Sequence, residues 1–196
     1  MKLFYSSGSP YARKVMACAI ACGLEERIAK VTTDPWSSPP ELVAQNPLSK
    51  VPCLVTEDGV ALFDSPVICE YLDSVGEGAL FPPSGAARWR ALKQQAVADG
   101  IMDAAILRRR EQARAAGESS PAAMARYHDA VTRALDMLER DPPADHLDIG
   151  TISIACALGY LDFRFAHEPW RPARPNLEAW LARMQPRPEL VRTAPA

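Results

Sequence analysis

The sequence predicts an α/β half followed by an all-α half. Short strand-like and helical segments alternate over residues 2–75. Gly and Pro then gather in residues 76–85 without hydrophobic periodicity, which is typical of a connection between domains. Beyond this stretch only helical patterns remain. At 196 residues, of which 48% are hydrophobic and 23% charged, the chain is long enough for two small domains with a buried core.

The α/β half is expected in the order βαβαββα. Short apolar or β-branched runs between turn residues predict the strands, and Ser-Pro starts predict helices. Glu57-Asp58-Gly59 indicates a hairpin. The predicted segments are Lys2 to Tyr5, Ser9 to Cys22, Arg27 to Thr32, Glu41 to Gln45, Val51 to Thr56, Val60 to Phe63, and a helix from Asp64 with the apolar stripe Val67, Ile68, Tyr71 and Leu72.

The second half reads as helices separated by Gly and Pro. The nearly continuous apolar run from Thr151 to Phe165 predicts the buried central helix. The other predicted helices are Ala86 to about Ala116, a helix carrying Met124, Tyr127, Val131, Leu135 and Leu138, and short helices near Asn176 to Met184 and Glu189 to Arg192. We therefore divide the chain into an α/β domain (1–76), a linker (77–85) and an all-α domain (86–196).

Charge and hydropathy exclude several classes of partner. The 22 basic and 24 acidic side chains give a net charge of -2, so no overall field attracts nucleic acid or an anionic membrane. The longest apolar runs are too short to cross about 30 Å of hydrocarbon. The N-terminal residues lack the apolar block of a secretory signal. We expect a mature cytoplasmic protein.

The cysteines and histidines point to neither disulfides nor metal. The five cysteines are an odd number, form no Cys-x-x-Cys pair and stand in apolar surroundings, which favours buried free thiols in a reducing compartment. His128, His146 and His167 lack ligand-like neighbours at metal spacing. We predict no metal site.

Three segments contain residues that could bind a ligand or take part in catalysis, and the first is Ser9-Pro10. Ser at the N-cap with Pro at the next position is a common helix start, and taken alone that structural reading is favoured. A hydroxyl beside a helix N-terminus also has chemical value. It can donate to a thiolate while the helix dipole lowers the thiol pKa from about 8.5.

The second segment is Lys50-Val51-Pro52. Proline at a strand start is tolerated at a sheet edge, and the preceding peptide bond can be cis. A cis bond would present the N–H and C=O of Val51 to an extended peptide, which would add as another strand. An ordinary turn proline is the alternative.

The third segment is Asp64-Ser65-Pro66, whose residues capping alone would explain. Ser65 and the free amides of this helix start would nevertheless bind a carboxylate, and Asp64 an ammonium group. Together they suit the α-amino acid end of a ligand. The three segments are specific only in combination and in this order.

With these segments the chain resembles the glutathione S-transferase family, in its serine-type bacterial form, over essentially its full length. The resemblance implies a thioredoxin-like N-terminal domain, an all-α C-terminal domain and a glutathione site. It assigns catalysis to Ser9, the cysteinyl backbone to Val51-Pro52, and the γ-glutamyl end to Asp64 and Ser65. Lys50 is placed to reach the glycyl carboxylate, with a solvated surface lysine as an equal alternative. The glutathione-binding residues expected in all are Ser9, Tyr11, Lys50, Val51, Pro52, Asp64 and Ser65.

Some features depart from the family pattern or leave alternatives open. The family's Ser/Thr-x-x-Asp capping box would begin at Thr151, but Ile154 stands at the reciprocal position, which puts the local stability in doubt. Ser6 and Ser7 compete with Ser9 for the sulfur. Tyr5 is a further competitor, although a strand residue is expected to pack.

The second substrate is expected between the domains, against the long helix of the all-α half. Met102, Asp103, Ile106 and Arg109 share or border one face there. Asp103 either faces the glutathione amine of a partner subunit or pairs with a nearby arginine, the latter slightly favoured. The run Arg108-Arg109-Arg110 either binds an anionic group or is a solvated face.

The function expected is that of a cytoplasmic, homodimeric glutathione transferase in detoxification. Glutathione is the co-substrate, and neither a metal nor a tightly bound cofactor is needed. Two alternatives remain open at this point. One is a non-catalytic member that binds ligands or regulates a partner, and the other is a glutathione-dependent thiol-disulfide reductase or isomerase.

Overall fold

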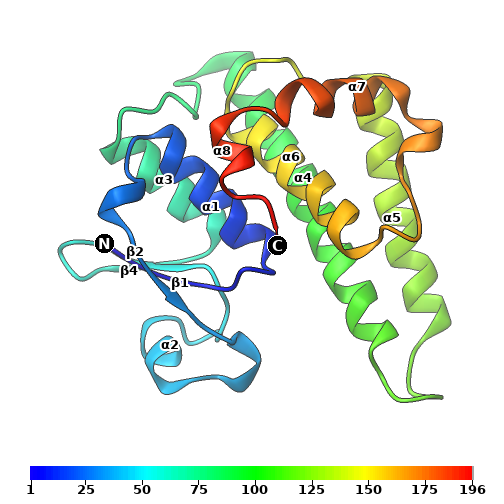
Figure 1. Ribbon diagram of the computed structural model, residues 1–196, viewed down its shortest axis with the longest axis horizontal. Helices are drawn as coiled ribbons and strands as arrows, with labels where there is room; N and C mark the ends of the chain where they lie inside the picture. The colour runs from blue at the N-terminus through cyan, green and yellow to red at the C-terminus, as the bar shows by residue number, and fades with distance from the viewer. Residues whose placement is uncertain (196) are drawn as a thin grey trace.

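The computed structural model describes residues 1–195 and places a small sheet with its helices beside a helical bundle (Figure 1). The first part of the chain forms the sheet and three helices. Its elements are β1 (Lys2–Tyr5), α1 (Pro10–Ala21), β2 (Ala29–Thr32), α2 (Pro40–Gln45), β3 (Cys53–Val55), β4 (Ala61–Leu62) and α3 (Ser65–Val75). The predicted order βαβαββα and the thioredoxin-like fold are confirmed.

The sheet has the strand order β2-β1-β3-β4, with β1 parallel to β2 and antiparallel to β3. Successive side chains of a strand face opposite sides, and both sides here are covered. Leu3 and Leu54 join the core that α1 and α3 form on one face, whereas Phe4 and Cys53 pack with Leu42 of α2 on the other. This two-sided burial holds β1 and β3 in register.

The second part of the chain is helical, as predicted. Its helices are α4 (Gly85–Gln112), α5 (Pro121–Arg140), α6 (Ile149–Arg164), α7 (Pro175–Met184) and α8 (Pro188–Val191). α6 packs against α4 and also against α1, so one continuous core joins the two parts (Figure 1). The prediction of a buried central helix is confirmed, because most residues from Ile149 to Leu161 are inaccessible to solvent.

Two details of the α/β part differ from the predictions. The stripe of α3 is made by Ile68, Cys69 and Leu72, while Val67 is 47% exposed, because a helix that begins at Ser65 turns Val67 away from the sheet. The proline at the start of β3 does not mark a sheet edge, since β3 lies between β1 and β4. Pro52 precedes the first paired residue, Cys53, so its missing N–H removes no ladder bond.

The capping box of α6 is complete, in contrast to the prediction. The N-cap is Asp148, three residues earlier than expected, and Thr151 is the reciprocal residue. The Asp148 carboxylate accepts from the Thr151 N–H at 2.8 Å, and the Asp148 N–H donates to the Thr151 hydroxyl at 2.9 Å. Aspartate and the hydroxyl residue have exchanged places, which satisfies the same two amides.

Residues 76–84 contain neither helix nor strand, and the domain division at 77–85 stays a prediction. Leu80, in the middle of the segment, is held by two hydrogen bonds. The Leu80 N–H donates to the Asp73 carboxylate at 2.7 Å, and the Leu80 carbonyl accepts from the Ile149 N–H at 2.9 Å. Over residues 1–195, no helix combines the length and apolarity that crossing a bilayer requires.

Candidate functional site

Ser9 is the N-cap of α1, as predicted. Its hydroxyl oxygen accepts from the Ala12 N–H at 3.2 Å, and Pro10 occupies the first helical position. The capping bond uses the oxygen as an acceptor, so the hydroxyl proton remains available to an anion. β1 ends at Tyr5 as predicted, and the side chain of Tyr5 packs against the core. Ser7 lines the same small hollow as Ser9, so the choice of Ser9 among these hydroxyls stays a prediction.

Val51 lies just before β3 with its backbone free. The Val51–Pro52 peptide bond is cis, and neither the N–H nor the C=O of Val51 forms a backbone hydrogen bond within residues 1–195. The backbone groups there suit antiparallel pairing with an extended ligand. Lys50 follows the turn on the exposed surface.

Asn46 shapes the turn that presents Val51, a role that the sequence analysis missed. Its side chain is 1% exposed, donates to the Lys50 carbonyl at 2.9 Å and accepts from the Leu48 N–H at 3.0 Å. Asn followed by Pro is a common turn start, because the Asn side chain can bond to the backbone two residues later. That dipeptide was the available signal.

The start of α3 presents free polar groups. Ser65 is buried at the first helical position, and its N–H and that of Val67 form no backbone hydrogen bond within the described chain. The exposed Asp64 is the N-cap, yet its side chain makes no capping bond, unlike Ser9. These amides and the hydroxyl suit a carboxylate, and the free Asp64 suits a cation.

The strand register brings these three segments to one end of the sheet. Phe4 pairs with Cys53, so the C-terminal end of β1, which leads to Ser9, lies beside the start of β3, which follows Val51. β4 runs antiparallel to β3 and pairs through Leu62 with Leu54, so α3 begins at the same end. The three segments thus share one edge of the molecule although they are spread over residues 9–65.

Tyr11 is placed differently from its predicted role as a glutathione contact. Its hydroxyl is turned toward α4, where it donates to the Asp103 carboxylate in a short hydrogen bond. Burial, together with this bond to Asp103, raises the pKa of Tyr11 far above its usual value. The geometry therefore supports a contact between the two parts of the chain. Asp103 pairs with this tyrosine, so the favoured pairing with an arginine is wrong.

A second polar contact joins α1 to α4 one turn further on. The ammonium of Lys14 is completely buried and lies 2.6 Å from the Asp99 carboxylate. Burial raises the pKa of Asp99, while the charge of Lys14 opposes that shift. The sequence analysis missed this pair, because a lysine inside an amphipathic helix usually faces water.

The remaining residues of the predicted second-substrate face differ in their exposure to solvent. Met102 is 0% exposed and belongs to the core, so the structure contradicts its placement in the cleft. Ile106 is half-buried and Asp103 exposed. The exposed Arg109 donates to the Tyr160 hydroxyl of α6 at 3.5 Å.

The three consecutive arginines of α4 have three different environments. Arg108 forms a two-point ion pair with Glu168 at 2.7 and 2.8 Å, and Arg110 lies over the Trp36 ring at 4.6 Å. Arg109, between them, points to Tyr160. The run is therefore not one uniformly solvated face, and the assignment of Arg109 to a second-substrate cleft stays a prediction.

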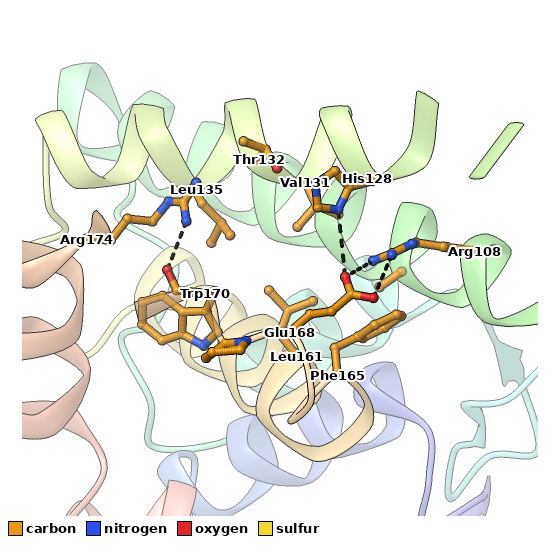
Figure 2. A pocket seen from close by; sticks show the side chains of 12 residues that line it. Arg108, His128, Val131, Thr132, Leu135, Leu161, Phe165, Glu168, Trp170 and Arg174 are labelled. Atoms are coloured by element: carbon orange, nitrogen blue, oxygen red, sulfur yellow. Dashed lines mark hydrogen bonds and ion pairs between the residues drawn. The ribbon is translucent and has the colours of Figure 1, made fainter. Parts of the chain in front are cut away.

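A hollow of about 250 Å³ lies in the helical part, Ser9 is not among its lining residues, and Figure 2 shows the side chains that are. Leu135, Leu161 and Trp170 are among its apolar lining. Of its charged groups, Arg108 and His128 pair with Glu168, and Arg174 pairs with Asp136 outside the hollow. The hydrogen bonds from Arg108 hold the pKa of Glu168 below its usual value. The hollow presents no thiol and no unpaired acid, so we do not place the candidate site there.

The chain's own thiols are poor candidates for a nucleophile. All five cysteines are buried and free of disulfides. Burial raises the thiol pKa of Cys22 to about 12 and that of Cys53 to about 11, and it also raises the pKa values of Cys18 and Cys156. Among residues 1–195, no three His, Cys, Asp or Glu side chains are grouped closely enough to hold a metal ion.

Comparisons with known proteins agree with this geometry. The N-terminal domain of glutathione S-transferases matches residues 8–75, and their C-terminal domain matches residues 121–183. The chain is 36% identical to the uncharacterized GST-like protein YibF of Escherichia coli (strain K12), over 100% of the chain and 98% of that protein.

Two solved structures are similar over almost their full length. One is a glutathione transferase family member from Pseudomonas fluorescens Pf-5 with bound glutathione (42% identity, TM-score 0.94, covering 100% of this chain and 98% of that one). The other is a glutathione S-transferase from Methylobacillus flagellatus KT with glutathione bound (33% identity, TM-score 0.92, covering 100% and 99%).

Proposed function

Because the chain belongs to the glutathione S-transferase family, we propose that it is a glutathione transferase that joins the sulfur of glutathione to an electrophilic carbon of a small, largely apolar molecule. The observation that carries this proposal is the Ser9 hydroxyl, which caps α1 as an acceptor and keeps its proton free. Support also comes from the two similar structures that were solved with glutathione.

Glutathione is proposed to lie extended along the shared end of the sheet. The cysteinyl backbone pairs with the free N–H and C=O of Val51 beside Pro52. The γ-glutamyl carboxylate meets Ser65 and the free amides of α3, while its ammonium group meets Asp64. Lys50 is close enough in sequence to serve the glycyl carboxylate.

In the proposed reaction Ser9 donates its proton in a hydrogen bond to the thiolate, and the N-terminus of α1 favours the negative charge. The thiol releases its proton to solvent, the sulfur attacks the carbon, and the leaving group departs with its electron pair. Lowering the thiol pKa from about 9 to about 6.5 requires about 1.4 kcal/mol per unit. One hydrogen bond to an anion and a helix dipole supply a stabilisation of that order.

The electrophile is proposed to bind between the two parts of the chain, near Ile106 and Arg109 of α4. We also propose a cytoplasmic homodimer that needs no tightly bound cofactor, which the family membership and the five free cysteines support. Disulfide exchange is a weaker candidate, because a hydroxyl stands at the start of α1 and the chain's own thiols are buried.

Two measurements on the full chain test the proposal: retention on immobilised glutathione and the rate of thioether formation with chlorodinitrobenzene. We expect retention, and turnover that falls at least about tenfold in Ser9→Ala through the lost hydrogen bond to the thiolate. Retention without turnover of any activated aryl halide would identify a binding protein instead. Reduction of mixed disulfides would identify an exchange enzyme, and failure to be retained would reject the glutathione site.

A further inference from the structure

Three arginines from three different helices contact Tyr160, its neighbour Gly159 or the loop that leads to the start of α1. Arg13 of α1 lies against Gly159, where an added Cβ would meet its guanidinium. Arg164 of α6 lies in the same way against Gly8 of the loop before Ser9. Arg109 of α4 reaches the Tyr160 hydroxyl. We call Arg13, Arg109 and Arg164 the arginine cluster.

The cluster has no acidic ion-pair partner in the part of the chain that the structure describes. None of the ion pairs formed within residues 1–195 includes any of its three members. This sets it apart from Arg108, Arg171 and Arg174, which bind Glu168, Asp162 and Asp136. Guanidinium groups stay charged over the whole physiological pH range.

Several donors of the cluster are also without a partner among residues 1–195. Within this range, the Nε and one Nη of Arg13 are buried without a hydrogen bond, and so is the Nε of Arg164. Arg13 makes one bond, to the Leu190 carbonyl at 3.2 Å. Buried donors are nearly always satisfied in folded proteins, so these groups call for an acceptor.

The cluster adjoins the proposed position of the sulfur. Arg13 and Tyr160 line one small hollow together with Ser9, and Gly8 under Arg164 is the residue before Ser9. The exposed Arg109 reaches the hydroxyl of Tyr160, a residue of the same hollow. A group attached to the sulfur through one or two atoms would therefore come within reach of the arginines.

We propose that the electrophile carries an anionic group, such as a carboxylate, and that Arg109 and Arg164 bind this group. The positive charge of Arg13 attracts the same group without contacting it. This inference rests on the proposed function, and it narrows the substrate class from largely apolar to anionic. Planar guanidinium groups match a carboxylate with two parallel hydrogen bonds. In the displacement the sulfur–carbon bond forms as the bond to the leaving group breaks, that group takes the electron pair, and the carboxylate is unchanged.

The test compares ligands that differ in charge and hardly in shape. Calorimetry on the full chain measures the dissociation constants of glutathione, S-(carboxymethyl)glutathione and S-(carbamoylmethyl)glutathione. We expect the carboxylate to bind about tenfold more tightly than the amide, the effect of one charged hydrogen-bonded pair. Raising the salt concentration should reduce this ratio.

Variants assign the preference to the cluster. Arg109→Gln and Arg164→Gln should each bring the carboxylate-to-amide ratio toward one and leave the affinity for glutathione nearly unchanged. Arg133→Gln is the matched control, because Arg133 is an exposed arginine of α5 outside the cluster. Arg109 is exposed on α4, so its variant keeps the test valid should substitution of the more buried Arg164 prevent folding.

The outcomes separate this inference from the function on which it rests. If glutathione and the amide bind but the carboxylate has no advantage, the anionic substrate class is rejected and the transferase proposal stands. If the variants shift the titration of the glutathione thiol and leave the ratio unchanged, the cluster serves the thiolate and the inference is overturned. If none of the three ligands binds, both proposals fail.

Discussion

The first turn of α1 and the rest of the same helix differ in whether their polar side chains are paired within the protein. At the first turn, the Ser9 hydroxyl keeps its proton free, at the same end of the sheet where Val51 keeps its backbone groups free. Further along, Tyr11 and Lys14 are paired with Asp103 and Asp99 across the junction with α4. The helix thus presents one end to a ligand and uses the remainder to hold two parts of the chain together.

The contrast extends to thiols. Burial raises the pKa of the Cys18 thiol on α1 well above its usual value and so favours its protonated form. The helix start, by contrast, is proposed to hold the thiol of glutathione in its ionised form. α1 would then provide two environments for a sulfur atom. The Cys18 sulfur lies in an apolar interior that favours the thiol, whereas the glutathione sulfur is proposed to lie beside hydrogen-bond donors that favour the thiolate.

Alkaline pH should produce the largest effect on the interior. Folded-state thiol pKa values are raised, to about 11 for Cys53 and about 12 for Cys22, so above about pH 8.5 the unfolded chain releases protons that the folded chain retains. The contribution of these thiols to the free energy of unfolding is therefore fully present below that pH and is lost as the pH rises. We expect the free energy of unfolding to drop by about 3 kcal/mol between pH 9 and 10, summed over Cys18, Cys22 and Cys53.

Urea denaturation at several pH values measures this drop, and Cys53→Ala should reduce the slope by about a third, because one of the three thiols with strongly raised pKa values is removed. A free energy of unfolding that stays constant from pH 8 to 10 would show that the interior does not hold these thiols protonated.

The buried ion pair should give the next largest effect. Lys14→Met leaves Asp99 without its partner at a largely buried position, and we expect a loss of about 3 kcal/mol in the free energy of unfolding. The double variant Lys14→Met/Asp99→Leu should recover most of this loss, since an apolar pair needs no compensation. Equal losses in the single and double variants would mean that the lost packing of lysine dominates.

At the ligand end, Ser65→Ala should weaken glutathione binding by about 1–2 kcal/mol and change stability little. The reason is that the Ser65 hydroxyl at the start of α3 is proposed to contact the γ-glutamyl carboxylate. Calorimetry with glutathione measures the change. Unchanged affinity would remove Ser65 from the proposed site.

The smallest effect concerns the capping box of α6, which lies outside the site. Thr151→Val removes the hydroxyl that accepts from the Asp148 N–H, and we expect a loss of about 1 kcal/mol in the free energy of unfolding. Glutathione affinity should not change. A marked loss of glutathione affinity would show that the capping box of α6 influences the glutathione site, which would contradict the separation between the interior and the ligand-binding end.

Local signals were sufficient for most of the fold. The residues Ser9-Pro10 predict the start of α1, and Glu57 to Gly59 predict the hairpin between β3 and β4. Such local signals were enough to predict the order of the elements. The capping box was misplaced because Asp148 and Thr151 exchange the usual residues, which local pattern cannot distinguish from a helix that starts three residues later.

Long-range pairing was not predictable in the same way. Lys14 with Asp99 and Tyr11 with Asp103 are 85 and 92 residues apart, so only the packing of α1 on α4 reveals them. The environment of Arg13 and Arg164 likewise depends on which helices surround them, so no local pattern indicates that their buried donors lack partners within residues 1–195. Met102 was placed in the cleft because helical spacing alone does not fix which neighbouring face is covered.

The ionisation of bound glutathione tests the central claim most directly. Ultraviolet titration of the complex measures the thiolate in the parent chain, in Ser9→Ala and in Ser120→Ala. Ser120 is the matched control, since it caps α5 with a bond of the same 3.2 Å to Ala123 and lies on a different helix. We predict a thiolate signal near neutral pH in the parent and in Ser120→Ala, and its loss in Ser9→Ala. A parent without that signal, or a signal that survives in Ser9→Ala, would contradict the account.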